Sequence, residues 1–285
     1  MAEHGSQRTL TTRGWHDFWA KGGWWRAFLF ALVYLVLYLG AGWIVGQLFG
    51  SEENADDLFA TPQSVFFALM LPLIVGSILL AAFVLSVGWF RELFGRQPIR
   101  GRWWMWVAPV LVVAAIVLRL FGIDYSSYQA SVVAVTMLTG VFIGFAEEIL
   151  TRGIVVKMLR DAGRSEWVVM VLSSLVFSLL HATNILSGQP ILTVLATMGF
   201  TFAFGICMYL TLRATGNLIW PMLIHGLYDP TLFLATGGID HAATVGQSPL
   251  LALAGPANLV YILIAIVALI VVRGHVQPRA AELPR

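Results

Sequence analysis

The sequence predicts an all-α membrane protein, a polytopic bundle of about eight transmembrane helices. Its 285 residues are 59% hydrophobic and only 11% charged, and the mean hydropathy is +0.82. A water-soluble domain does not carry such a composition, and apolar runs of spanning length recur along the whole chain. No linker rich in Pro, Gly or Ser separates these runs, so we expect a single membrane domain over residues 1–285.

The first segment, residues 1–25, mixes Arg8, Arg13 and Lys21 with five aromatic residues. This pattern is typical of a segment at the headgroup layer, so we expect an interfacial and cytoplasmic N-terminal region. The apolar run 26–49 is too long for the core of a signal peptide and is expected to be the first span. The expected spans are 26–49, 64–89, 103–122, 129–158, 166–186, 190–213, 217–236 and 249–272. Gly199 and Gly205 lie inside spans, where glycine usually marks a close contact between helices.

The loops between these spans alternate in charge. The loop after the first span holds four carboxylates and no Lys or Arg, whereas the next loop holds Arg91, Arg96, Arg100 and Arg102. The alternation continues to the C-terminal tail, and Arg119 is the exception. By the positive-inside rule both termini should be cytoplasmic, which requires an even number of spans.

Two adjacent carboxylates, Glu147 and Glu148, interrupt the apolar run 129–158, and Arg152 follows four residues after the second. Ionisable groups at membrane depth are costly and usually functional. On a helix, Glu148 and Arg152 share a face and can pair, whereas Glu147 points about 100° away. We therefore expect one paired carboxylate and one that is available for chemistry.

Two of the six histidines lie inside expected spans. His181 ends one span, and His225 stands four residues before Asp229, so that both polar groups share a helix face. Either histidine alone could be a core residue that bonds a carbonyl, but buried ionisable groups usually meet in the bundle interior. With a helix turn near Arg164, Glu147 and His181 each lie roughly 25 Å along their helices. His225 lies only about 14 Å from its turn, so that turn must lie deeper, or the helix must tilt or break at Pro221 or Pro230.

A cluster of Glu147, His181, His225 and Asp229 suits hydrolysis, with a carboxylate that takes a proton from water and imidazoles that hold the water. The candidates Glu147, His181 and His225 could instead hold a divalent metal such as zinc. No His-Glu-x-x-His motif and no Gly-x-Ser-x-Gly motif occurs, and the single Cys207 is expected to be a core residue. The sequence leaves metal dependence open.

Three patterns occur in a fixed order: Glu147-Glu148-x-x-x-Arg152, Phe177-x-x-x-His181 and His225-x-x-x-Asp229. They resemble the three motifs of the CAAX-protease and bacteriocin-processing family of intramembrane proteases, which are similar to type II CAAX prenyl endopeptidases. The third motif of that family ends in Asn or Asp, and the resemblance covers roughly residues 140–235.

The resemblance implies an eight-helix bundle whose catalytic core is formed by residues 129–236. It also implies peptide-bond hydrolysis in a cavity open to the membrane. The position of Glu147 would activate water, and those of His181, His225 and Asp229 would hold the water and stabilise the oxyanion, with Glu148 and Arg152 beside them. Members are commonly called metalloproteases, although the mechanism proposed for the family needs no metal.

The expected partners are membrane lipids and a hydrophobic, lipidated or bacteriocin-like peptide, and no nucleic acid. The expected location is the bacterial plasma (inner) membrane. Two alternatives from other classes stay open: a non-catalytic immunity or scaffold protein that binds such peptides, and a proton-coupled transporter that uses the carboxylates as a relay. No paired inverted repeat is evident to support the transporter.

Overall fold

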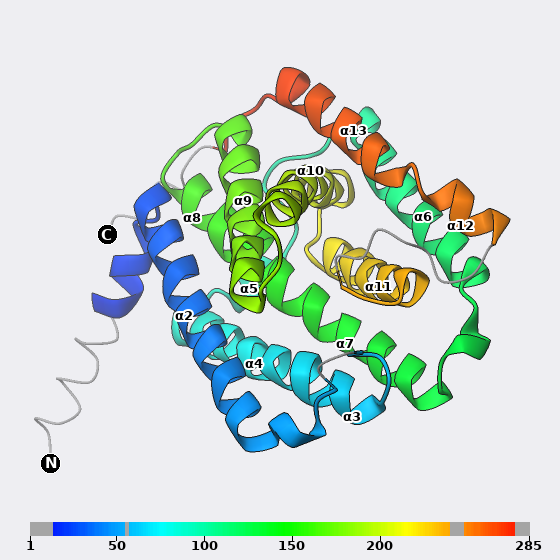
Figure 1. Ribbon diagram of the computed structural model, residues 1–285. Coiled ribbons are helices and arrows are strands. Elements are labelled where there is room, and N and C mark those ends of the chain that lie inside the picture. Colours follow the sequence, from blue (N-terminus) through cyan, green and yellow to red (C-terminus); the bar gives the residue numbers. More distant parts are fainter. Residues whose placement is uncertain (1–13, 55–56, 240–247, 277–285) are drawn as a thin grey trace, which may run out of the picture.

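A computed structural model describes residues 14–54, 57–239 and 248–276, and this part of the chain is a bundle of helices (Figure 1). Arg8, Arg13 and the last residues of the tail lie outside these ranges. The α-helices after a short N-terminal turn of helix at residues 14–20 are α2 (Trp24–Phe49), α3 (Pro62–Val65), α4 (Leu71–Ser86), α5 (Phe90–Phe94), α6 (Val107–Gly122), α7 (Ala130–Glu148), α8 (Val156–Asp161), α9 (Glu166–Leu180), α10 (Ile191–Thr215), α11 (Ile219–Thr236), α12 (Pro249–Ala254) and α13 (Ala257–Val271).

Tighter or wider turns extend several of these helices. The 3₁₀ segments are η1 (Gly50–Glu52), η3 (Trp103–Trp106), η4 (Tyr125–Ser127) and η6 (His181–Ser187), and the π-helical segments are η2 (Phe66–Met70) and η5 (Ile149–Val155). Within the described ranges the β-structure is an isolated bridge between Ser165 and His275. The predicted all-α membrane bundle is therefore confirmed.

Seven helical segments in the described residues are long and apolar enough to cross a membrane. They are Trp24–Glu52, Pro62–Ser86, Trp103–Gly122, Ala130–Asp161, Glu166–Ser187, Ile191–Thr215 and Pro249–Val271. Helix α11 has 18 residues but contains His225, Asp229 and Pro230. By length and composition the bundle thus has one span fewer than the eight predicted, and α11 makes the difference because its polar residues lower its hydropathy.

Helix α11 packs closely and antiparallel against α7 near the centre of the bundle (Figure 1). A Cβ on Gly140 would lie 1.9 Å from the Gly226 carbonyl oxygen, and one on Gly144 would lie 2.1 Å from the Met222 carbonyl oxygen. Only glycine allows backbones to approach so closely. This contact brings the polar face of α11 against the end of α7 that carries Glu147 and Glu148.

The turn between α10 and α11 explains why His225 follows it so soon. Residues 94–101 cover this turn: the Gln97 amide donates to the Gly216 carbonyl at 2.9 Å, and Asn217 Nδ2 donates to the Phe94 carbonyl at 3.5 Å. Arg213 and Leu218 at its two ends are buried. Helix α11 continues unbroken from Ile219 to Thr236, so of the three alternatives the break does not occur, and a deeper turn or a tilt remains.

The two glycines predicted to mark helix contacts, Gly199 and Gly205, differ in how closely other atoms approach them. A Cβ on Gly205 would lie 3.0 Å from Arg152 Nη2 and 3.1 Å from Ser174 Cβ, so this position requires a small residue. A Cβ on Gly199 would have no atom within 4 Å, and the prediction for Gly199 is wrong. Gly199 lies six residues before Gly205 on α10, and at about 100° per residue it therefore lies on a different face of the helix.

A buried ionic cluster at one end of the bundle joins α8, α9 and α10. The Glu166 carboxylate accepts from Arg160 Nε at 2.8 Å, from Arg160 Nη2 at 2.7 Å and from Arg213 Nη1 at 2.9 Å, and Tyr209 also donates to it. Arg160 Nη1 donates to Gln97 Oε1 at 2.6 Å, so the loop before η3 is also part of the cluster. We call these residues, Gln97, Arg160, Glu166, Tyr209 and Arg213, the basic-end clamp.

Candidate active site

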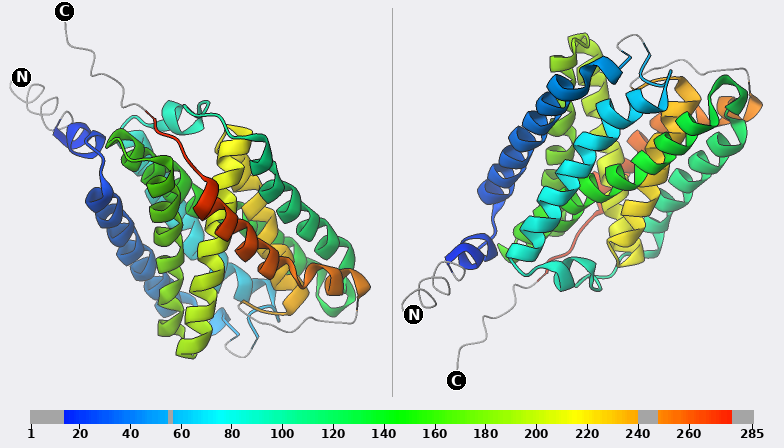
Figure 2. Two further views of the ribbon diagram at one scale, coloured as in Figure 1. Left: turned by 90° about the horizontal axis from the view of Figure 1, so that it is seen from above. Right: turned by 90° about the horizontal axis from the view of Figure 1, so that it is seen from below.

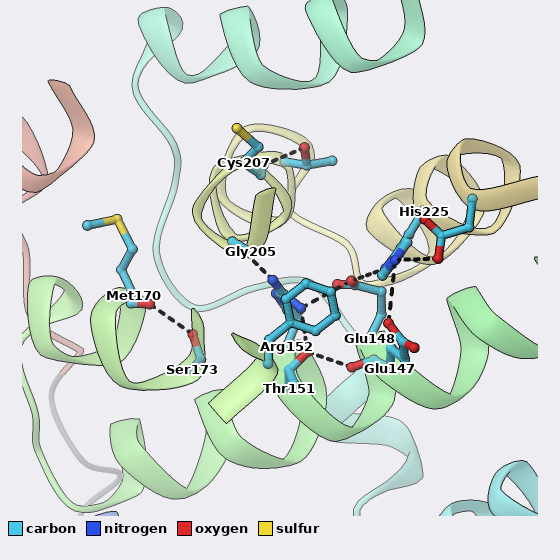
Figure 3. Close-up of polar contacts among 12 residues, drawn as sticks. Glu147, Glu148, Thr151, Arg152, Met170, Ser173, Gly205, Cys207 and His225 are labelled. Carbon is cyan, nitrogen blue, oxygen red and sulfur yellow. Dashed lines mark hydrogen bonds and ion pairs between the residues drawn. The ribbon is translucent and has the colours of Figure 1, made fainter. Parts of the chain in front are cut away.

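The site lies where α7 ends and the π-helical segment η5 begins. Glu148 ends α7, and Arg152 lies within η5, a wider turn of the kind that often occurs at functional sites. Arg152 Nη1 donates to Glu148 Oε1 at 3.2 Å, and both side chains are fully buried. Arg152 also bonds Thr151 Oγ1 at 2.5 Å and, through Nη2, the Gly205 carbonyl at 2.7 Å (Figure 3). The predicted pair of Glu148 and Arg152 therefore forms.

His225 contacts carboxylates on both of its ring nitrogens. Its Nδ1 lies 2.7 Å from Glu148 Oε1, while its Nε2 lies 3.5 Å from Glu147 Oε2 and 3.4 Å from Asp229 Oδ2. Figure 3 shows the imidazole between the two glutamates. Because a carboxylate accepts hydrogen bonds, an imidazolium with both nitrogens protonated satisfies all of these contacts. The α7–α11 contact thus brings together residues that stand about 80 positions apart in the sequence.

Glu147 has a different environment from Glu148. A quarter of its side chain is exposed, and its Oε2 atom has no hydrogen-bond partner within the described residues. Glu147 lines a cavity of about 260 Å³ together with His181 and Asp229. The predicted division into one paired and one available carboxylate agrees with this geometry.

His181 lies at the end of α9, where the helix narrows into η6. Its Nδ1 lies 3.0 Å from the carbonyl oxygen of Phe177, which can only accept, so Nδ1 donates. In the neutral imidazole the lone pair is then on Nε2, the nitrogen available to the cavity that His181 lines. The two residues of the Phe177-x-x-x-His181 pattern are therefore linked by this bond.

Two of the three predicted metal candidates, Glu147 and His225, lie in a group that could hold a metal ion. Glu147, His225 and Asp229 each offer one ligand atom within 4.8 Å of the others, and His181 is not part of this group. Two carboxylates and an imidazole suit a divalent cation. Asp229 joins this group because the i, i+4 spacing on α11 places it beside His225, and His181 stays a predicted candidate.

Sequence reasoning included Phe177 as a motif residue but missed the other aromatic residues around the site. Phe177 packs edge-on against both histidines, at centroid distances of 4.9 Å to His181 and 5.5 Å to His225, and it also lies 4.8 Å from the Arg152 guanidinium carbon. Phe204 packs against His225 at 5.1 Å. Tyr34 and Tyr38 on α2 line the cavity as well, and their i, i+4 spacing was a signal in an otherwise apolar run.

Comparison with known proteins identifies the segment that carries the motifs. Residues 128–231 match the family model described as Type II CAAX prenyl endopeptidase Rce1-like. No curated protein and no solved structure matches the chain. The matched segment contains all three motifs, and the description of the family gives no support to the term metalloprotease. The resemblance drawn from the motifs is thus confirmed: residues 128–231 are similar to the Rce1-like type II CAAX prenyl endopeptidases, and the chain is an integral membrane protein.

Proposed function

We propose that the protein is an intramembrane endopeptidase in which Glu147 activates the attacking water. The observation that carries this proposal is the lining of one cavity by Glu147, His181 and Asp229. The Glu147 side chain is a quarter exposed and lines this cavity, so its carboxylate can accept a proton from water. His181 Nε2 can accept the second water proton, so the two residues would hold the water with its lone pair directed away from them.

Glu148 and Arg152 have a positioning role in this proposal. Glu148 holds His225 by its Nδ1 at 2.7 Å, and Arg152 neutralises Glu148 at 3.2 Å. Phe177 and Phe204 exclude other positions of the His225 ring. His225 would in turn hold Glu147 and Asp229 through Nε2, which fixes the carboxylate that acts on water.

A bound divalent cation is compatible with the same residues. Glu147, His225 and Asp229 would hold the cation, and the cation would polarise a water molecule. With the cation bound, His225 would not need its second proton. In either case the excess negative charge of the converging carboxylates is balanced, by a proton on His225 or by the cation.

The apolar surroundings support a hydrophobic or lipidated peptide as substrate. Most of the residues that line the cavity are apolar, and it shares Leu35 and Leu180 with a second hollow of about 380 Å³ between α2 and α9. That hollow is lined entirely by apolar residues, including Trp25, Leu32 and Leu179. An acyl or prenyl chain of the substrate would gain about 0.8 kcal/mol for each buried CH₂ group.

The proposed function also has a location and a domain organisation. We place the protein in a bacterial plasma membrane as one membrane domain, with residues 129–236 as its catalytic core. Membrane lipids surround the bundle, since large apolar side chains such as Trp43, Leu85 and Leu192 are more than half exposed.

The test compares peptide termini in membranes that carry wild type or Glu147→Gln at matched protein levels. Glutamine keeps the shape of Glu147 but cannot accept the proton, so we expect new termini that depend on Glu147 and a loss of rate of about 10²–10⁴-fold. Glu52→Gln makes the same chemical change on an exposed acidic turn and serves as the control. A phenotype that survives Glu147→Gln, without any change in termini, would instead favour an immunity or scaffold protein.

A further inference from the structure

Two tyrosines of the first span face the catalytic cavity. Tyr34 and Tyr38 on α2 line the same cavity as Glu147, His181 and Asp229, and their rings stack with centroids 6.1 Å apart. No hydrogen bond of either hydroxyl is found within the described part of the chain, and Glu147 interacts electrostatically with both residues. Helix α2 lies outside the segment matched by the family model.

Gly76 of α4 leaves space for the side chains of Tyr34 and Tyr38. A Cβ on Gly76 would lie 2.6 Å from the Tyr34 hydroxyl oxygen and 3.1 Å from Tyr38 Cδ2. The absence of a side chain at Gly76 therefore permits both rings to lie against α4. The position of the Tyr34 hydroxyl and of the Tyr38 ring depends on this contact.

The site needs a hydrogen-bond donor that its motif residues do not provide. A developing oxyanion is stabilised by preorganised donors. Asp229 has a carboxylate, which when ionised only accepts, and His225 already directs both nitrogens at carboxylates. His181 donates through Nδ1 to the Phe177 carbonyl.

The other polar side chains of the described cavity wall are also engaged. Thr183 Oγ1 donates to the Leu180 carbonyl at 2.7 Å, and Thr201 Oγ1 donates to the Met198 carbonyl at 3.2 Å. Asn184 likewise has an interaction partner. The Tyr34 and Tyr38 hydroxyls are thus the best-placed donors in the described wall.

We propose that the hydroxyls of Tyr34 and Tyr38 donate hydrogen bonds to the carbonyl oxygen of the scissile peptide and stabilise its oxyanion. The inference rests on the proposed function. The water oxygen forms a bond to the carbonyl carbon as its proton passes to Glu147, and the π electrons move onto the carbonyl oxygen beside the tyrosines. The carbonyl then re-forms, the C–N bond breaks, and Glu147 returns the proton to the leaving nitrogen. The tyrosines keep their protons throughout.

The experiment measures kcat and KM for Tyr34→Phe, Tyr38→Phe and the double variant in proteoliposomes. The probe is a quenched-fluorescence prenylated CAAX peptide or, if wild type does not cut it, the peptide identified by the comparison of termini. Phenylalanine keeps the ring stack, so we expect KM to stay within about twofold and kcat of the double variant to fall by about 10²–10³-fold. A peptide aldehyde of the same sequence, whose hydrate carries the tetrahedral oxygen, should lose affinity in proportion.

Matched control variants separate the loss of the two hydroxyls from general effects of a substitution. Tyr261→Phe removes a hydroxyl from α13 outside the cavity and should retain wild-type kcat. Gly76→Ala should displace the Tyr34 hydroxyl and lower kcat, whereas Gly46→Ala, which meets no atom within 4 Å, should not. The proposal is overturned if the double variant and Gly76→Ala keep wild-type kcat while Glu147→Gln is inactive. If Glu147→Gln is also fully active, the proposed function itself has failed.

Discussion

Two neighbouring glutamates with the same chemistry have different environments because a helix turns by about 100° per residue. Glu148 is fully buried, and its Oε1 accepts from Arg152 Nη1 and His225 Nδ1. Glu147 opens into the cavity, and its contact with His225 Nε2 is longer, at 3.5 Å. Glu148, which makes the closer contacts, therefore orients the site, and Glu147, which makes fewer, is placed to react.

We predict that Arg152→Ala lowers the stability of the folded protein as well as its activity. Removal of one partner from a fully buried ion pair leaves Glu148 without its counter-charge and costs about 3–5 kcal/mol. The measurements are the folded yield in detergent and the thermal unfolding midpoint. Arg91→Ala, an exposed arginine of the basic loop, provides the comparison and should melt like wild type. An Arg152→Ala protein with wild-type yield and midpoint would contradict the energetic role of the pair.

At the scale of elements, the packing of α7 against α11 decides whether the site exists. The motifs lie on three separate helices, and the glycines at positions 140, 144 and 226 bring two of these helices close enough for His225 to reach Glu147 and Glu148. Helix α9 contributes His181 at its narrowed end. The site therefore depends on small residues that carry no chemistry themselves.

We predict that Gly144→Ala reduces activity by separating α7 from α11. The added Cβ would lie 2.1 Å from the Met222 carbonyl oxygen, a backbone atom that cannot move without the whole helix. The expected result is a fall in kcat together with a lower unfolding midpoint, because overpacking typically costs about 1–3 kcal/mol. Gly199→Ala is the control, since its Cβ meets no atom within 4 Å and alanine favours the helix. Wild-type kcat in Gly144→Ala would show that the helices need not be so close.

The whole molecule has two chemically different ends. The basic-end clamp joins the loop before η3 to α8, α9 and α10, and the backbone amide of Glu166 also donates to the Gly274 carbonyl at 3.0 Å. Gly23 donates to the Met158 carbonyl at 2.8 Å, so the described beginning and end of the chain lie near this end (Figure 2). At the other end Tyr128 bonds the Leu234 carbonyl at 2.9 Å and Gln129 approaches the Ala60 carbonyl at 3.4 Å.

We predict that both termini are cytoplasmic, because the basic loops converge on the end where the chain begins and finishes. Epitope tags at the two termini should both be digested only when protease reaches the cytoplasmic face of sealed vesicles. A tag inserted beside Glu52, in the acidic turn after α2, should show the opposite protection. Termini on opposite sides would mean an odd number of spans and would remove α11 from the count.

The class of fold and most of its elements could be predicted from the amino-acid sequence alone. Apolar length predicted the spans, since backbone groups in hydrocarbon must be satisfied within a helix, and the i, i+4 spacing predicted the pairs Glu148–Arg152 and His225–Asp229. Both pairs are local, so periodicity was sufficient. The polarity of α11 was visible too, although its length alone suggested an ordinary span.

Only the tertiary structure decided which groups meet across helices. The contact of His225 with both glutamates and the meeting of Glu147, His225 and Asp229 in one group depend on how close two backbones come. The place of Tyr34 and Tyr38 in the cavity wall depends in the same way on Gly76. Periodicity gives the face of a helix on which a residue lies, whereas the partner of that face is set by side-chain volume at positions far apart in the chain.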